Sequence, residues 1–125
     1  MLSPAAISAA KKRITYGNKE AHHEHDDCIR IAYEWLDAQV KIKGTVGHSF
    51  PIKHMIEKWG GRYVSQSDVE VAAAMHPDIR GEYPRFNISS RLTRPSDARL
   101  KGISEAKTQG YEIDESSAKA YSRTE

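Results

Sequence analysis

Residues 63–77, YVSQSDVEVAAAMHP, decide the fold that we expect for this chain. Ser65 and the acid Asp68 three residues later resemble a capping box, with Asp in place of the usual Glu or Gln. Val64 before the cap and Val69 four residues after it can form the accompanying hydrophobic staple. Three consecutive alanines allow close helix packing, and the final proline stops the helix. The stretch therefore predicts a short, buried helix over residues 65–75.

A longer helix is expected before this stretch, over residues 20–43. Asp26 and Asp27 precede its apolar part and Lys41 and Lys43 end it, which is the order of charges that the helix dipole favours. Its apolar residues recur with helical spacing, at Cys28, Ile29, Ile31, Ala32, Tyr33, Trp35, Leu36 and Val40. We expect this helix to pack in the core or to form the contact of a homodimer.

A second amphipathic helix is predicted between these two. Ser49 is a plausible N-cap and Pro51 lies near the first turn, where its missing amide is harmless. Gly60 and Gly61 supply the stop. The apolar positions follow the i, i+3, i+4, i+7 pattern, at Ile52, Met55, Ile56 and Trp59.

The segment after Pro77 carries the polar and basic side chains of a DNA reader. Pro84 can open a helix at its first turn, and Thr93-Arg94-Pro95 can close it. The predicted helix 84–94 presents Arg85, Asn87, Ser90, Arg91 and Arg94. Arg can bridge guanine O6 and N7, Asn can bridge adenine N6 and N7, and Ser and Arg can bind phosphates. These residues predict a DNA-contacting helix.

The order of elements from Ile52 to Ile113 resembles the helix-turn-helix and winged-helix class of DNA-binding domains. The resemblance implies that residues 85–94 read double-stranded DNA and that Arg99 and Lys101 contact phosphates from a basic wing. In this interpretation residues 99–103 and 111–113 form a β hairpin. Ser96 could instead cap a short helix with Leu100 and Ile103 inward. The expected fold class is mainly α, with a short β hairpin as an option.

Composition limits the class of protein. The chain has 125 residues, a net charge of +2 and 38% hydrophobic residues, which suits one domain with a modest core. We expect a flexible basic arm over 1–18, a single helical domain over 19–113 and a polar tail over 114–125. The single cysteine, Cys28, fits a reducing cytoplasmic setting, and no apolar run is long enough to cross a bilayer.

Charge is segregated along the chain. Residues 1–19 carry four bases and no acid, and residues 80–107 carry seven bases and three acids. Residues 20–79 carry ten acids and six bases. DNA binding needs a local basic surface to displace phosphate counterions, so the 80–107 block supports it. The acidic region 20–79 supports the alternative, a protein-binding adaptor or inhibitor.

No catalytic or cofactor motif is present in the sequence. The string His22-His23-Glu24-His25 concentrates metal-ligating side chains, but neighbouring residues on a helix point in different directions and no second ligand pair follows. We therefore expect no metal, no cofactor and no enzymatic activity. The function expected is that of a DNA-binding protein such as a phage or plasmid regulator or a replication accessory.

Overall fold

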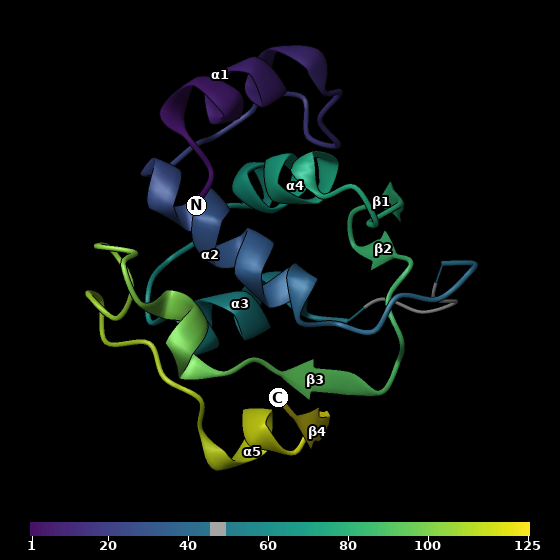
Figure 1. The fold of residues 1–125 in the computed structure, drawn as a ribbon, viewed down its shortest axis with the longest axis vertical. Helices are drawn as coiled ribbons and strands as arrows, with labels where there is room; N and C mark the ends of the chain where they lie inside the picture. Colours follow the sequence, from purple (N-terminus) through teal and green to yellow (C-terminus); the bar gives the residue numbers. More distant parts are fainter. Residues whose placement is uncertain (46–49) are drawn as a thin grey trace.

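The computed structural model describes residues 1–45 and 50–125, which are mainly helical with two small two-stranded sheets (Figure 1). The helices are α1 (Pro4–Arg13), α2 (Asp26–Asp37), α3 (Ile52–Gly60), α4 (Gln66–Met75) and α5 (Glu115–Ala118), with the 3₁₀ helix η1 at Asp97–Leu100. The strands are β1 (Gly81–Glu82), β2 (Arg85–Phe86), β3 (Leu92–Arg94) and β4 (Tyr121–Thr124).

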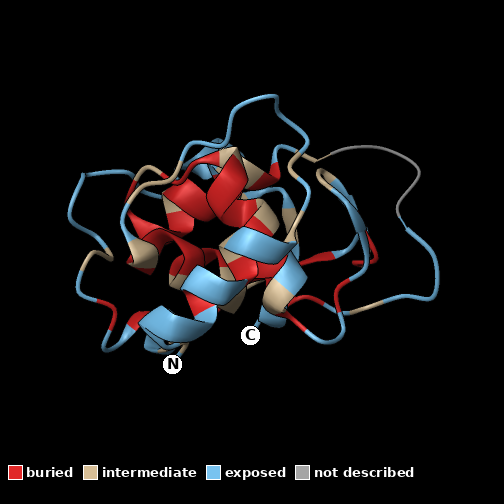
Figure 2. Cartoon of the chain, turned by 90° about the horizontal axis from the view of Figure 1, so that it is seen from above, coloured by how far each residue is buried: buried red, intermediate tan, exposed pale blue. Residues whose placement is uncertain are grey.

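The core lies where α2 packs against α4. Helix α1 covers α4, and α3 and η1 contact α2 (Figure 1). Buried residues are concentrated on these central helices, whereas the connecting loops are largely exposed (Figure 2). Trp35, Leu36 and Ile56 are fully buried. A fully buried Leu or Ile side chain contributes about 1.5–3 kcal/mol to folding, so the burial of such residues on the central helices is a large source of stability.

Helix α4 forms as its sequence predicts. The Ser65 hydroxyl caps it by accepting a hydrogen bond from the Asp68 amide at 3.1 Å. The expected return bond of the capping box is replaced, because the Asp68 carboxylate instead accepts hydrogen bonds from the His23 ring and the Glu24 amide. The acid at this position therefore joins two segments of the chain.

Helix α3 also matches the expected apolar pattern. It ends at Gly61, whose φ of 67° is in the left-handed region that favours glycine. A Cβ at Gly61 would lie 2.6 Å from the Lys107 Cα, so this stop also allows a close approach of two chain segments. Pro51 occupies the N-cap position, and the expected cap Ser49 lies outside the described residues.

The helix expected over 20–43 is shorter than predicted, because both of its ends bind other segments. At the start, the His22 backbone binds the hydroxyls of Ser65 and Ser67, which holds the chain extended before α2. At the end, the Gln39 side chain exchanges hydrogen bonds with the Thr93 backbone. Most of the apolar face that was considered for a homodimer is buried inside the chain, whereas Tyr33 is half-buried and Val40 is exposed.

The predicted helix 84–94 was wrong. This segment contains β2 and β3, separated by a loop that pairs with residues 40–42. The backbone of Ile88 bridges Lys41, and the Ser89 amide donates to the Val40 carbonyl at 2.7 Å. These inter-segment bonds replace helical ones. The second helix of a helix-turn-helix is therefore not formed.

The expected wing was wrong as well, and the short-helix alternative matches η1. Ser96 caps η1 through the Ala98 amide, and residues 111–113 are not in a strand. The β hairpin of the structure lies earlier, where β1 pairs with β2 (Gly81 opposite Phe86). Strand β3 pairs in parallel with β4, with Leu92 opposite Tyr121.

Both chain ends are more ordered than expected. The proposed flexible arm contains α1, in which Ile7 and Ala10 are fully buried. The proposed polar tail contains α5 and β4, and the Trp35 indole donates a hydrogen bond to the Tyr121 hydroxyl at 2.9 Å. Within 1–45 and 50–125, no helix is both long and apolar enough to span a bilayer.

Replacing Ser65 by alanine should lower the free energy of unfolding by about 1–2 kcal/mol, because the α4 cap is lost. The same hydroxyl donates to the His22 carbonyl at 2.6 Å, so the segment before α2 is released as well. Urea denaturation followed by circular dichroism measures the effect. The exposed Ser104→Ala variant is the control, and equal stability of the two variants would contradict the role of the cap.

Candidate nucleic-acid interface

The residues predicted to contact DNA do not share one surface. Arg85, Ser90 and Arg91 are exposed on the hairpin and on the loop that follows it. Asn87 lies between them but is only 1% exposed. Arg94 is half-buried on β3, and Arg99 and Lys101 lie at η1, on the opposite side of the molecule from the hairpin (Figure 1). The structure therefore brings together only Arg85, Ser90 and Arg91 of the residues predicted to contact DNA.

Asn87 is a structural residue. Its Oδ1 accepts from the Arg80 amide, and its Nδ2 donates to the carbonyls of Asp78 at 2.9 Å and Ile42 at 3.4 Å. Its own carbonyl accepts from the Ile42 amide at 2.9 Å. The amide side chain thus binds three backbone groups, and it cannot read a base edge without breaking them.

Replacing Asn87 by alanine should lower the free energy of unfolding by about 2 kcal/mol, because buried backbone groups lose their partners. Arg85→Ala, at an exposed position two residues earlier, should leave stability within about 0.5 kcal/mol. Thermal or urea denaturation of both variants compares them. A stable Asn87→Ala protein would mean that this side chain is available for another role.

Arg99 is bound by carboxylates. Its guanidinium donates to Glu34 at 3.0 Å, to Asp37 at 2.8 Å and to both carboxylate oxygens of Glu125 at 2.6–2.7 Å. The bond to Glu125 is the main cause of a raised Arg99 pKa. Burial opposes ionisation of Asp37, but hydrogen bonds from Arg99 and His76 keep the Asp37 pKa below its usual range. The predicted phosphate contact is therefore already neutralised.

Replacing Arg99 by alanine should destabilise the fold by about 1 kcal/mol at neutral pH. The pKa values of Asp37 and Glu125 are lowered in the folded state, so their contribution is present above the ordinary carboxyl pKa of about 4. It is lost as the pH falls through the lowered values. The Arg99→Ala deficit should therefore shrink toward about pH 2.

Urea denaturation at the two pH values measures this deficit. Arg123→Ala is the matched control, since Arg123 is exposed and forms no ion pair within the described ranges. A deficit that is the same at both pH values would show that Arg99 acts through packing alone.

The half-buried Lys41 and four exposed cations around the hairpin form one surface, which we call the basic edge: Lys41, Lys43, Arg80, Arg85 and Arg91. Residues 40–42 and 87–89 are joined by the Lys41–Ile88 bridge and by backbone hydrogen bonds, which bring the two cationic segments side by side. The segments lie beside β1 and β2 at the right of Figure 1. Asp78 and Glu82 are the acids of this region.

The cations of the basic edge differ in whether their side chains are hydrogen-bonded within the fold. The Lys41 ammonium donates to the Asp37 carbonyl at 2.7 Å, and burial is the main cause that lowers the Lys41 pKa. The Arg80 guanidinium donates to the carbonyls of Ile42 and Lys43. The side chains of Lys43, Arg85 and Arg91 have no hydrogen-bond or ion-pair partner in the part of the chain that the structure describes. These three are free to bind an external anion.

The acids of region 20–79 are, by contrast, largely used inside the fold. Asp27 pairs with Arg30 at 2.6 Å, and the Asp27 pKa is lowered by hydrogen bonds from Arg30 and the Glu105 amide against the effect of burial. Eight of the ten acids have a hydrogen-bond or ion-pair partner: Glu24, Asp26, Asp27, Glu34, Asp37, Glu57, Asp68 and Glu70. Region 20–79 is therefore acidic in sequence, but few of its carboxylates are free at the surface.

Sequence reasoning missed Lys41, Lys43 and Arg80 as members of the interface. The alternation Val40-Lys41-Ile42-Lys43 was a signal, because a period of two places both lysines on one face of an extended segment. The helix prediction over 20–43 hid that signal. Arg80 had no local signal, since only the pairing of distant segments places it beside Lys43.

The histidine cluster serves the fold. His22 pairs with Glu24, and His25 caps α2 by accepting from the Asp27 amide. His23 lies between the Tyr16 hydroxyl at 2.8 Å and the Asp68 carboxylate at 2.7 Å. This order of groups is that of a catalytic triad, but burial raises the Tyr16 pKa, which keeps the phenol protonated, and the hydroxyl also donates to the Lys11 carbonyl at 3.3 Å. Residues 1–45 and 50–125 contain no group of three metal-ligating side chains.

Cys28 is not a reactive thiol. It is fully buried in α2 and its Sγ donates to the Tyr63 carbonyl at 3.5 Å. Burial raises the pKa of Cys28 to about 12, which leaves almost no thiolate at neutral pH.

Comparison of the chain with models of known protein families, with curated protein sequences and with solved structures found no match.

Proposed function

We propose that this protein is a non-enzymatic DNA-binding protein that contacts double-stranded DNA through the basic edge. The observation that supports the proposal is that acidic side chains are mostly bound within the fold, whereas several basic side chains are not. Acids are mostly bound by other groups of the fold, whereas Lys43, Arg85 and Arg91 have no partner among the described residues. A small net charge of +2 therefore coexists with a local cluster of free cations.

The shape of the edge suits a duplex. A two-stranded β ribbon fits the major groove, and cations on neighbouring extended segments can follow the phosphates on either side. Arg85 on β2 is the side chain placed to reach base edges. Lys43, Ser90 and Arg91 are placed to bind phosphates. Asn87 and Arg99 are left out of this assignment, since their polar atoms are bound within the fold.

The alternative function, a protein-binding adaptor or inhibitor that acts through region 20–79, has weaker support. Recognition by acidic side chains requires carboxylates that are free to pair with a partner. In this region, Glu20 and Asp78 are the acids whose side chains lack a partner among the described residues. They are too few to form an acidic docking surface.

Fluorescence anisotropy with a labelled duplex DNA at a series of salt concentrations tests the proposal. Binding should weaken steeply with salt, because bound phosphates release counterions. The Arg85→Ala/Arg91→Ala double variant should bind more weakly, with a salt slope shallower by about 1, because Arg91 is the member of this pair assigned to a phosphate.

Lys101→Ala is the control, because Lys101 is an exposed cation at the opposite side of the molecule. It should bind DNA as the unmodified protein does. Absence of binding at low salt would overturn the proposed function, and equal weakening by all variants would overturn the assignment to the basic edge.

A further inference from the structure

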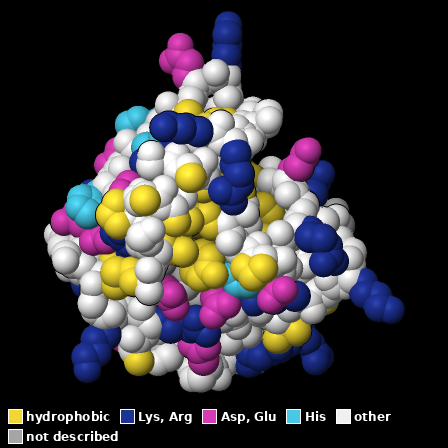
Figure 3. All heavy atoms as spheres, turned by 45° about the horizontal axis from the view of Figure 1, so that its top comes forward, with side chains coloured by type: hydrophobic (Ala, Val, Ile, Leu, Met, Phe, Trp, Pro, Cys, Tyr) yellow, Lys and Arg dark blue, Asp and Glu magenta, His cyan; other side chains and the backbone are white. Residues whose placement is uncertain are grey.

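A pocket of about 350 Å³ opens beside the basic edge, between the end of α1, α4 and the β1–β2 hairpin. This volume is within the range of small-molecule sites, about 300–1,000 Å³. Its floor consists of small and aliphatic side chains from three segments, Ile14, Ala73, Ala74 and Ile79. Figure 3 shows, on the tilted face of the molecule, hydrophobic side chains in a hollow with Lys and Arg side chains at its border.

Aromatic rings form the walls of this pocket. Tyr83 and Phe86 come from the hairpin, with ring centroids 6.3 Å apart in an edge-to-face arrangement. Tyr16 comes from the segment after α1, and its hydroxyl is fixed by His23. Planar walls of this kind suit a flat aromatic ligand, because the ligand ring can stack on their faces.

Two carboxylates line this pocket, the half-buried Glu70 of α4 and the exposed Glu82 of β1. Glu70 of α4 accepts hydrogen bonds from the Gly17 amide at 2.8 Å and from the Gln66 side chain at 3.2 Å, one on each oxygen. Each oxygen keeps a second lone pair. Glu70 and Tyr83 line the same pocket, and burial, with a smaller contribution from the Glu70 charge, raises the Tyr83 pKa. Glu70 forms no ion pair with any described residue.

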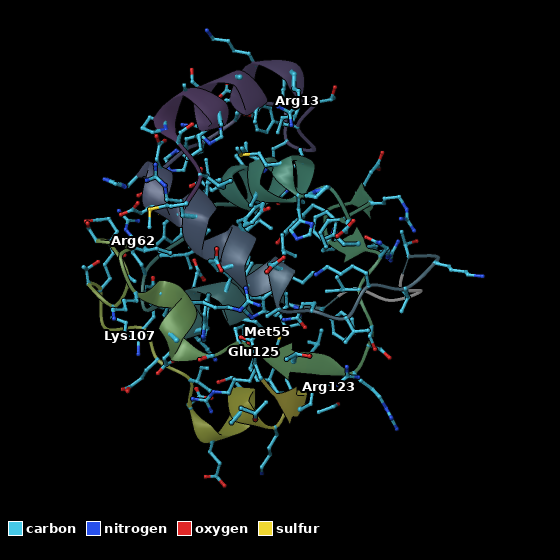
Figure 4. All side chains as sticks on the ribbon, in the orientation of Figure 1. Arg13, Met55, Arg62, Lys107, Arg123 and Glu125 are labelled. Carbon is cyan, nitrogen blue, oxygen red and sulfur yellow. The ribbon has the colours of Figure 1, made fainter. Side chains whose placement is uncertain are left out.

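Each of the two segments flanking α4 carries arginine at the edge of the pocket. Arg13 directly precedes Ile14, and its guanidinium donates to the Ala74 carbonyl at 3.3 Å, at the end of α4 (Figure 4). Arg80 lies between the lining residues Ile79 and Gly81, with its guanidinium on the carbonyls of Ile42 and Lys43, and Arg85 directly precedes the lining residue Phe86. Aliphatic and aromatic walls with arginines on the adjoining segments match a ligand that has a flat ring and a phosphate.

We infer that this pocket receives an unpaired nucleobase of the DNA held on the basic edge, with the exposed Arg13 at its border binding an adjacent phosphate. The inference rests on the proposed function and specifies its substrate class as a duplex that carries a bulged or extruded base. Bases that leave a duplex are recognised by stacking on aromatic side chains and by hydrogen bonds to their Watson–Crick edge.

Glu70 selects guanine among the four bases. A carboxylate accepts two parallel hydrogen bonds, and it therefore pairs best with two adjacent donors. Guanine presents N1–H and the N2 amino group side by side, whereas thymine presents one N–H between two carbonyl groups. A bulged guanine should therefore bind more tightly than a bulged thymine.

The test compares three labelled duplexes: fully paired, with one bulged guanine, and with one bulged thymine. Anisotropy should show about tenfold tighter binding of the guanine bulge than of the paired duplex, a difference of about 1.4 kcal/mol. Glu70→Gln should remove the preference for guanine over thymine. Ala74→Trp, which fills the pocket from an exposed helix position, should reduce binding of the bulged duplex to that of the paired one.

Ala5→Trp is the matched control, because Ala5 is exposed at the far end of α1. If Ala74→Trp does not fold, titration of the unmodified protein with guanosine and thymidine monophosphates, followed by the amide resonances of Gly17 and Gly81, replaces it. Stronger shifts with the guanosine nucleotide support the inference.

The two proposals fail in different ways. Equal binding of all three duplexes, together with loss of binding in Arg85→Ala/Arg91→Ala, overturns the pocket inference and leaves the basic edge intact. Absence of binding to every duplex at low salt overturns the proposed function itself.

Discussion

The buried Asp68 carboxylate is the constraint on which the arrangement of this molecule depends. It is 0% exposed, and it is held by the His23 ring and the Glu24 amide at the start of α4. A buried carboxylate is tolerated where hydrogen bonds replace its hydration. The same helix start binds the His22 backbone through two serine hydroxyls. One helix end thus fixes how the chain enters α2, and with it the α2–α4 core.

This anchoring extends to the candidate sites. His23, held by Asp68, positions Tyr16, and Glu70, two residues further along α4, binds the Gly17 amide. The segment after α1 is therefore attached to α4 at two points, and the gap between this segment and the hairpin is the pocket. Helix α4, whose sequence indicates core packing, accordingly also supplies one wall of the pocket. Helix α4 thus packs in the core and lines the pocket as well.

Local signals predicted the helices that depend on local physics. The caps and apolar spacing of α3 and α4 were sufficient, because a side-chain cap, a glycine stop and a proline act within a few residues. The segment 84–94 could not be predicted in this way. Its structure depends on Asn87, which binds backbone groups of Ile42 and Asp78, and on pairing with residues 40–42. The presence of Asn, Arg and Ser in a sequence does not show whether their side chains contact DNA or form hydrogen bonds with the protein's own backbone. Of the predicted contacts, Arg85, Ser90 and Arg91 remain on the proposed surface.

The net charge describes this molecule poorly, because most of its acidic side chains form ion pairs or hydrogen bonds within the fold, whereas several basic side chains do not. Arg99 alone engages Glu34, Asp37 and Glu125, and Arg62 engages Glu24 and Glu105. Two arginines therefore hold five carboxylates in ion pairs, although their charge offsets only two of the five, and other cations are left without acidic partners. Pairing of opposite charges at one side of the fold raises the relative number of free cations at the other. A nearly neutral chain can in this way present the local field that attracts a polyanion.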